Sequence, residues 1–199
     1  MKKLSLIAMI EASFFAAFAL ILDLLPSIKL TPAVSVSLAM VPIFVIAFRW
    51  GVRVSFLSGF LWGLLQIVIG DIQPLSALQL IIEYFIAFAF IGAAGLFYKP
   101  IQAAINHNNK KQLILYVVLA TFVGSFARYF WHFLAGFIYW GQYAPKGMNP
   151  VWYSFIVNGG TGLGAAVLCS VVLAILVPSA SRILVRKSVP MDTRNRHAS

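Results

Sequence analysis

The chain has 199 residues, of which 61% are hydrophobic and 10% are charged, and its formal net charge is +10. This composition excludes an ordinary water-soluble domain, in which about 25% of the residues are charged. A membrane-spanning helix needs about 20 apolar residues, so the length admits about six or seven spans and no second folded domain. Because Cys169 is the only cysteine, we expect neither a disulfide nor a thiolate metal site, and no metal or cofactor.

The apolar pattern predicts six membrane-spanning helices in chain order, near 5–25, 33–48, 52–69, 75–97, 112–139 and 152–178. Prolines, glycines and polar stretches separate them, with longer connections at 98–111 and 140–151. Pro42 lies inside the second span, where it either kinks the helix or shifts its start. We therefore predict an all-α integral membrane protein, with a single six-helix transmembrane domain at 1–187 and a polar, disordered cytoplasmic tail at 188–199.

The basic residues are spread over short connections and are not gathered on one polar face, which disfavours a nucleic-acid-binding protein. One side of the predicted bundle carries most of them: Lys2, Lys3, Arg49, Arg53, Lys99, Lys110, Lys111, Arg182, Arg186, Lys187, Arg194 and Arg196. The other side carries Lys29 and Lys146. By the positive-inside rule, both termini are cytoplasmic and the protein is a multi-pass protein of the cell membrane, with the connections at 26–32, 70–74 and 140–151 facing outward.

Polar side chains lie inside three of the predicted spans at similar depth. Glu83 and His132 each lie about 12 Å from the outer end of their helix, and Asn158 lies about 9 Å from the outer end of its own. Ser76, Gln79 and Glu83 follow at steps of three and four residues, so they share one helix face. A buried charge costs at least about 2.5 to 3.5 kcal/mol within a bilayer, so Glu83 needs a partner, water or a ligand. We predict a ligand pocket that opens on the outer side.

Each of these residues also has a structural interpretation. Glu83 could pair with Arg128, and His132 or Asn158 could simply join two helices by a hydrogen bond. Arg128 lies one turn deeper than His132 on about the same face, so it forms either the floor of the pocket or a tie between helices.

Two geometric constraints apply to the rim and to the fourth span. Trp140 and Tyr153 mark the outer rim of their helices, where they could belong to an interfacial aromatic belt. The side chains of Glu83 and Tyr84 point about 100° apart on the helix, so they cannot both point directly at one ligand position. The side chains of Tyr153 and Asn158 also point in different directions on a helix, unless Tyr153 reaches the pocket from the loop.

A deep carboxylate with aromatic walls suits a planar organic cation. The chain has no HExxH motif, no GxxxxGK[ST] phosphate-binding motif and no nucleophile–base–oxyanion arrangement. We therefore expect a binding protein and neither an enzyme nor an ATPase.

Three runs in the last third of the chain, together with Glu83-Tyr84, match a known pattern: Arg128-Tyr-Phe-Trp-His132-Phe-Leu-Ala-Gly136, Trp140-Gly-Gln-Tyr-Ala-Pro-Lys146-Gly and Tyr153-Ser-Phe-Ile-Val-Asn158-Gly. They resemble the thiamine-specific substrate-binding subunits (S components, ThiT/YuaJ family) of energy-coupling factor (ECF) transporters. The resemblance implies a high-affinity thiamine receptor that captures thiamine from the outer side. It also implies partners, namely one transmembrane coupling subunit and two ATPase subunits that drive uptake.

The resemblance also implies roles for individual residues. Glu83 would meet the positively charged and amino-bearing parts of thiamine, and Trp140 would stack on its ring. The pocket would be completed by Tyr84, His132, Tyr153 and Asn158. Family members place a tryptophan in the loop after the first span, where this chain has Thr31-Pro32-Ala33 instead.

Small residues one turn apart on the first helix match the family's partner-docking pattern. Ala12 pairs with Ala16, and Ser13 with Ala17, which allows close approach of another helix. The alternative interpretation is internal packing against a neighbouring span.

Two other functions stay open at this point. A stand-alone proton-coupled carrier of small organic cations would use Glu83 as its titrating group, and a membrane-embedded enzyme would need a catalytic constellation. Lys29 and Lys146 are the only cations near the outer rim, which favours unphosphorylated thiamine over its phosphates.

Overall fold

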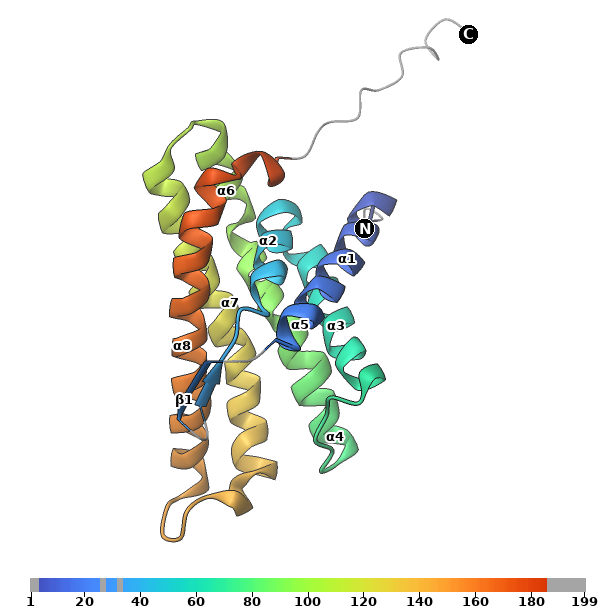
Figure 1. Cartoon of the computed structure of the whole chain (residues 1–199), viewed down its shortest axis with the longest axis vertical. Helices are drawn as coiled ribbons and strands as arrows, with labels where there is room; N and C mark the ends of the chain where they lie inside the picture. The colour runs from blue at the N-terminus through green and yellow to red at the C-terminus, as the bar shows by residue number, and fades with distance from the viewer. Residues whose placement is uncertain (1–3, 26–27, 32–33, 186–199) are drawn as a thin grey trace, which may run out of the picture.

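The computed structural model describes residues 4–25, 28–31 and 34–185. Its helices form one elongated bundle (Figure 1). The first half contains α1 (Leu6–Asp23), α2 (Val41–Trp50) and α3 (Val52–Ile69). A helical rod then runs through α4 (Ala77–Leu80), the π-helix η1 (Ile81–Ile86), α5 (Ala87–Phe90), the 3₁₀ helix η2 (Ile91–Phe97) and α6 (Tyr98–Asn106). The long helices α7 (Lys110–Tyr139) and α8 (Pro150–Ser179) follow, with the short 3₁₀ turns η3 (Gly141–Tyr143) and η4 (Ser181–Ile183).

Five helical stretches within the described residues are long and apolar enough to cross a membrane: Leu6–Asp23, Val52–Ile69, Ala77–Asn106, Lys110–Tyr139 and Pro150–Ser179. The apolar helix Val41–Trp50 is shorter. These six helices confirm the predicted all-α membrane class. The predicted tail at 188–199 lies outside the described residues.

The second span differs from the prediction of a helix over 33–48. Helix α2 begins at Val41, with Pro42 in its first turn, where the missing N–H has no intrahelical partner to lose. Pro42 therefore shifts the start of the helix. Before it, β1 (Ile28–Thr31) pairs in antiparallel fashion with β2 (Val34–Val36), a hairpin that the apolar pattern did not predict.

The predicted connection at 98–111 is mostly helix. Residues Tyr98–Asn106 continue the rod as α6, because Ile101 and Ala104 lie one turn apart and are both buried against the bundle. Only residues 107–109 separate α6 from α7.

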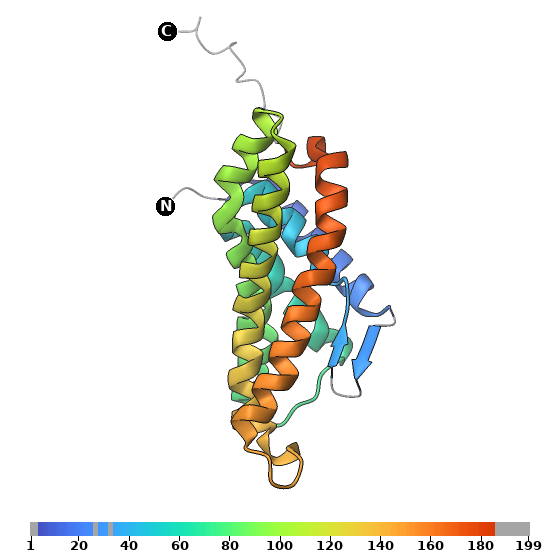
Figure 2. The ribbon, with the colours of Figure 1, turned by 90° about the vertical axis from the view of Figure 1, so that its left-hand side faces the viewer.

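The centre of the bundle is built around the short helix α2. Its Ile43, Phe44, Ile46, Ala47 and Phe48 are fully buried. Because protein surrounds α2 on all sides, its 10 residues do not have to cover a full bilayer thickness. Figure 2 shows the long antiparallel pair α7 and α8 flanking this core, with the β1–β2 hairpin beside α8.

The rod and α3 pack unusually close together at glycines. A Cβ atom added at Gly63 would lie 1.6 Å from the backbone oxygen of Tyr84, and one at Gly59 would lie 2.2 Å from that of Phe88. The same close approach occurs at Gly95 of the rod, where an added Cβ atom would lie 2.4 Å from the backbone nitrogen of Val52. These glycines fix the depth and rotation of the segment that carries Glu83.

Candidate ligand-binding site

A cavity of about 340 Å³ lies between the rod, α7 and α8, near the end of the bundle that holds the η3 loop. Its lining residues are Gln73, Glu83, His132, Gly136, Trp140, Tyr143, Tyr153, Ser154, Val157 and Asn158. The structure therefore brings together five of the six residues expected to bind ligand: Glu83, His132, Trp140, Tyr153 and Asn158.

Glu83 is held by two donors. The indole Nε1 of Trp140 donates to Glu83 Oε1 at 2.9 Å, and the amide Nε2 of Gln79 donates to Glu83 Oε2. The predicted shared face is confirmed for Gln79 and Glu83 by this side-chain hydrogen bond, and Ser76 caps α4 by accepting from the Gln79 backbone N–H at 3.1 Å. Glu83 itself lies in η1, and π-helical turns of this kind are frequent at functional sites.

Aromatic rings form the outer rim of the cavity. The rings of Trp140 and Tyr143 lie 5.6 Å apart at an interplanar angle of 39°, and both line the cavity. Since Trp140 also donates to Glu83, it is more than a member of an interfacial belt.

The wall formed by α8 includes both Tyr153 and Asn158, although they are five positions apart. Tyr153, Ser154, Val157 and Asn158 all line the cavity from an arc of about 140° of the helix surface. Helix α8 begins at Pro150, so Tyr153 reaches the cavity from the helix itself and not from the loop.

Asn158 is oriented by its neighbours. Its Nδ2 donates to Ser154 Oγ at 3.1 Å and to the Ser154 backbone oxygen at 3.2 Å. The Ser154 hydroxyl donates in turn to the backbone oxygen of Phe133 on α7 at 2.8 Å. Gly136 makes this contact possible, because a Cβ there would lie 2.2 Å from Ser154 Oγ. The carboxamide oxygen of Asn158 is left to accept from a ligand.

Tyr84 is not among the residues that line this cavity, and the ligand contact expected for it stays a prediction. The side chains of Glu83 and Tyr84 diverge, as adjacent positions on a helix must. The Tyr84 ring stacks on Phe88 with centroids 5.9 Å apart, and its hydroxyl accepts a hydrogen bond from the Gln73 backbone N–H at 3.3 Å. Tyr84 thus holds the loop that brings Gln73 to the cavity.

Arg128 and Glu83 form no ion pair among the residues that the structure describes. The Arg128 guanidinium lies over the rings of Phe88 and Trp62, at 4.2 Å and 4.8 Å from their centroids. Its Nε donates to His132 Nε2 at 3.3 Å. Arg128 therefore both ties α7 to α3 and the rod and orients the imidazole of His132.

A second cavity, of about 290 Å³, lies behind the first and shares His132 and Asn158 with it. Asp23 and Arg128 also line this second cavity. Arg128 therefore lines this second cavity but not the Glu83 cavity, in addition to tying the helices together.

The small residues of α1 divide into two faces. Ala12 and Ala16 are 0% exposed and belong to the buried core, and the Ala12 backbone oxygen accepts from Ser58 Oγ of α3 at 2.8 Å. This pair therefore packs inside the chain, which corrects its expected place on a partner surface. Ser13 and Ala17 lie about 100° further round the helix and are exposed.

Several features of the site lie beyond what the sequence predicted. Gln73, Tyr143, Ser154 and Val157 line the cavity but were not among the expected ligand-binding residues. Position 154 lies one helical turn before Asn158 and position 157 lies one turn after Tyr153, which is the signal that would have found them. Pro32 and Ala33, at the position of the family's loop tryptophan, lie outside the described residues. Among the described residues, no group of three or more His, Cys, Asp or Glu could hold a metal ion.

The fold and cavity together define a polytopic helical membrane protein with a polar, aromatic-rimmed cavity inside its bundle. Residues 9–185 match the family described as thiamine transporter protein (Thia_YuaJ), and the chain belongs to this family.

Relatives named thiamine transporter ThiT support the same assignment. The protein of Lacticaseibacillus paracasei is 38% identical over 185 residues, covering 92% of each chain. That of Bacillus subtilis is 40% identical over 182 residues, covering 90% of this chain and 94% of the relative. The solved structure of ThiT from Listeria monocytogenes superposes with a TM-score of 0.87 at 34% identity, covering 91% of this chain and 98% of the other.

Proposed function

We propose that this protein binds thiamine with high affinity in the cavity of Glu83 and serves as the substrate-binding subunit of an ECF-type importer. The observation that carries the proposal is the placement of Glu83, held by Trp140 and Gln79 inside a cavity of about 340 Å³. Thiamine is a cation with two planar aromatic rings joined by a methylene group, so it complements a carboxylate with aromatic neighbours. The names of the relatives support this choice of ligand.

Each lining residue has a part in the proposed mode of binding. The Glu83 carboxylate balances the positive charge and accepts from the amino-bearing part of the ligand. Trp140 stacks on a ring, and Tyr153 covers the rim. His132 and Asn158, both oriented by neighbouring side chains, supply directional hydrogen bonds. Tyr84 supports the site by accepting a hydrogen bond from the backbone of Gln73, which lines the cavity.

Both termini are cytoplasmic in this proposal, so the cavity opens outward. The α2–α3 turn, the start of α6 and η4 lie at one end of the bundle, and the connection between α7 and α8 lies at the other (Figure 1). The first three segments contain Arg49, Arg53, Lys99 and Arg182, and the last contains Lys146, which agrees with the positive-inside rule. ATP hydrolysis belongs to separate partner subunits, and the exposed residues Ser13 and Ala17 of α1 are the remaining candidates for contact with the coupling subunit.

The competing function is a stand-alone proton-coupled carrier of organic cations that titrates Glu83. Uptake of labelled thiamine into liposomes separates the two. The purified chain alone should give no uptake under an imposed pH gradient, whereas co-reconstitution with a coupling subunit and two ATPases should give ATP-dependent uptake. Uptake by the chain alone that depends on the pH gradient would refute the receptor role and establish the carrier.

A further inference from the structure

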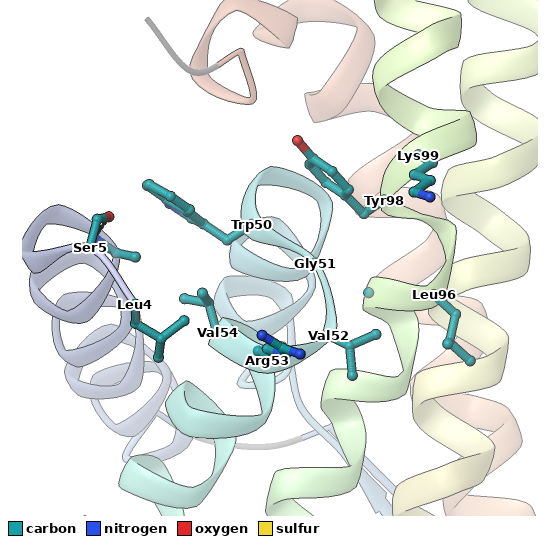
Figure 3. A pocket seen from close by; sticks show the side chains of 12 residues that line it. Leu4, Ser5, Trp50, Gly51, Val52, Arg53, Val54, Leu96, Tyr98 and Lys99 are labelled. Carbon is teal, nitrogen blue, oxygen red and sulfur yellow. Dashed lines mark hydrogen bonds between the residues drawn. The ribbon is translucent and has the colours of Figure 1, made fainter. Parts of the chain in front are cut away.

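A groove with a volume of about 640 Å³ lies at the opposite end of the bundle from the Glu83 cavity. It is formed by the start of α1, the turn between α2 and α3, and the junction of η2 with α6. Figure 3 shows Leu4 and Ser5 on one side of it, Leu96 and Lys99 on the other, and Arg53 between them. Nothing in the proposed capture of thiamine uses this groove.

The groove is positively charged. Arg53 and Lys99 both line it and are both exposed, and no Asp or Glu is among its lining residues. Within the part of the chain that the structure describes, neither Arg53 nor Lys99 forms an ion pair. Two cations from different helices therefore face one space without a counter-charge from that part of the chain.

The start of α3 adds to the positive potential. Gly51 is its N-cap residue, with φ 79°, and it provides no side-chain cap for the first turn. The first N–H groups of a helix lack intrahelical partners and carry the positive end of the helix dipole. Val52, Arg53 and Val54 of this first turn all line the groove, so it is suited to an oxyanion.

The rest of the lining is apolar or aromatic and is continuous with the surface expected to face lipid. Leu96 is 67% exposed, and Leu4 and Val52 line the same groove. Trp50 and Tyr98 border it, and tryptophan and tyrosine are enriched where a bilayer meets water. A free phosphate would not contact this apolar surface, whereas the glycerol backbone and the first acyl carbons of a lipid would cover it.

We propose that this groove binds the headgroup of an anionic phospholipid of the phosphatidylglycerol class, with the phosphodiester between Arg53, Lys99 and the start of α3. In the orientation proposed above, the lipid belongs to the inner leaflet. Its binding would anchor the α2–α3 turn at the membrane surface, through basic residues that attract anionic lipids.

The test uses the full chain in nanodiscs of phosphatidylglycerol and phosphatidylcholine in equal amounts, with the lipids retained on the released protein counted by native mass spectrometry. The groove variant is Arg53→Gln with Lys99→Gln. The control variant is Lys110→Gln with Lys111→Gln, which removes the same charge from exposed lysines at the same end of the bundle. Thiamine binding is measured on each preparation and should be equal in all three, which shows that the variants are folded.

The wild type should retain phosphatidylglycerol in preference to phosphatidylcholine, and the groove variant should lower that preference about tenfold while the control variant keeps it. Equal retention of the two lipids by the wild type would overturn the proposal. An equal loss in both variants would overturn it too, since it would indicate a general effect of surface charge. Unchanged lipid preference in the groove variant, together with lost uptake in the presence of the ATPase partners, would assign the groove to a protein partner instead.

Discussion

Trp140 makes two contacts at the rim: its indole N–H donates to Glu83 at 2.9 Å, and its ring lines the cavity beside Tyr143. The hydrogen bond orients the carboxylate, and the ring offers a stacking surface. The two contributions can be separated by substitution.

Trp140→Phe keeps an aromatic ring but removes the donor to Glu83. We expect thiamine affinity to fall by about 1.5 to 3 kcal/mol, the scale of a hydrogen bond to a charged group. Isothermal titration calorimetry measures the loss. Trp152→Phe is the matched control, because Trp152 lies 64% exposed at the start of α8 and outside the cavity lining, and it should leave the affinity unchanged. Equal effects of the two substitutions would contradict the role of Trp140.

Arg128 supports the site from below, between the rings of Phe88 and Trp62 and beside His132. Arg128→Lys keeps the charge but loses the planar guanidinium and its fixed donor geometry. We expect stability to fall by about 1 to 2 kcal/mol through the lost cation–π contacts and hydrogen bond. Thermal unfolding in detergent measures this, with Arg182→Lys as the control at an exposed position. An unchanged melting temperature would mean that Arg128 does not tie the helices together.

At the residue scale, the sequence predicted the polar centre of the site but not its supports. Glu83, His132 and Asn158 stand out because polar groups are costly at their depth in a span. Ser154 and Gln73 carry no such signal, since serine is common in spans and Gln73 reaches the cavity only through the path of its loop. The ligand contact of Tyr84 is expected from the family pattern and stays a prediction, since helix geometry points its side chain about 100° away from that of Glu83.

At the scale of the element, the rod from Ala77 to Asn106 is the part of the fold that sets the position of the acid. The π-helical turn at Ile81–Ile86 changes the rotation of the helix at Glu83, and the glycines of α3 allow the Tyr84 backbone to approach. Helix packing and ligand recognition are therefore coupled at this turn.

Gly63→Ala tests this coupling. The new methyl group would overlap the Tyr84 backbone oxygen at 1.6 Å, and backbone cannot yield as a flexible side chain can. We expect a loss of stability of about 1 to 3 kcal/mol, with weaker thiamine binding because Glu83 moves with Tyr84. Thermal unfolding and calorimetry on the same preparations measure both effects.

Gly159→Ala is the matched control for this substitution, since a Cβ at Gly159 meets nothing within 4 Å. It should leave stability unchanged or slightly raise it, because alanine is the better helix former. If Gly63→Ala were as harmless as Gly159→Ala, the close approach of α3 to the rod would be wrong.

Element boundaries show where sequence patterns were ambiguous. Hydropathy alone does not distinguish an apolar strand from an apolar helix, so residues 33–40 were assigned to the second span. The position of Pro42 was compatible with a kink or a helix start, and only the contacts of the buried helix α2 decide between them. Residues 98–106 were likewise assigned to a connection because they are polar in composition, and the amphipathic pattern of α6 is short.

At the scale of the whole molecule, a polar cluster joins the first and last helices at the end opposite the Glu83 cavity. Arg49 of α2 donates to Glu11 of α1 at 2.6 Å and 2.9 Å, and the indole of Trp50 donates to the same carboxylate at 2.6 Å. Arg49 also donates to the backbone oxygens of Ile183 and, at 3.1 Å, Val185. The start and the end of the described chain are thereby held on the same side of the bundle.

Glu11→Gln should loosen this end without affecting ligand capture. The pair is partly exposed, so screening limits its contribution, and we expect a loss of about 1 kcal/mol in stability. Thiamine affinity should not change, because Glu11 is not among the residues that line the Glu83 cavity. Thermal unfolding and a thiamine titration measure the two quantities, and a large loss of affinity with intact stability would contradict this separation of the two ends.

Binding of the thiamine cation by Glu83 can be measured by titrating the detergent-purified chain with thiamine and following tryptophan fluorescence. The wild type should show saturable quenching, and Glu83→Gln should bind about 1.5 to 3 kcal/mol more weakly. Asp71→Asn, which removes an exposed carboxylate, should bind like the wild type. Absence of a response to thiamine, or equal affinity in Glu83→Gln and the wild type, would contradict the account.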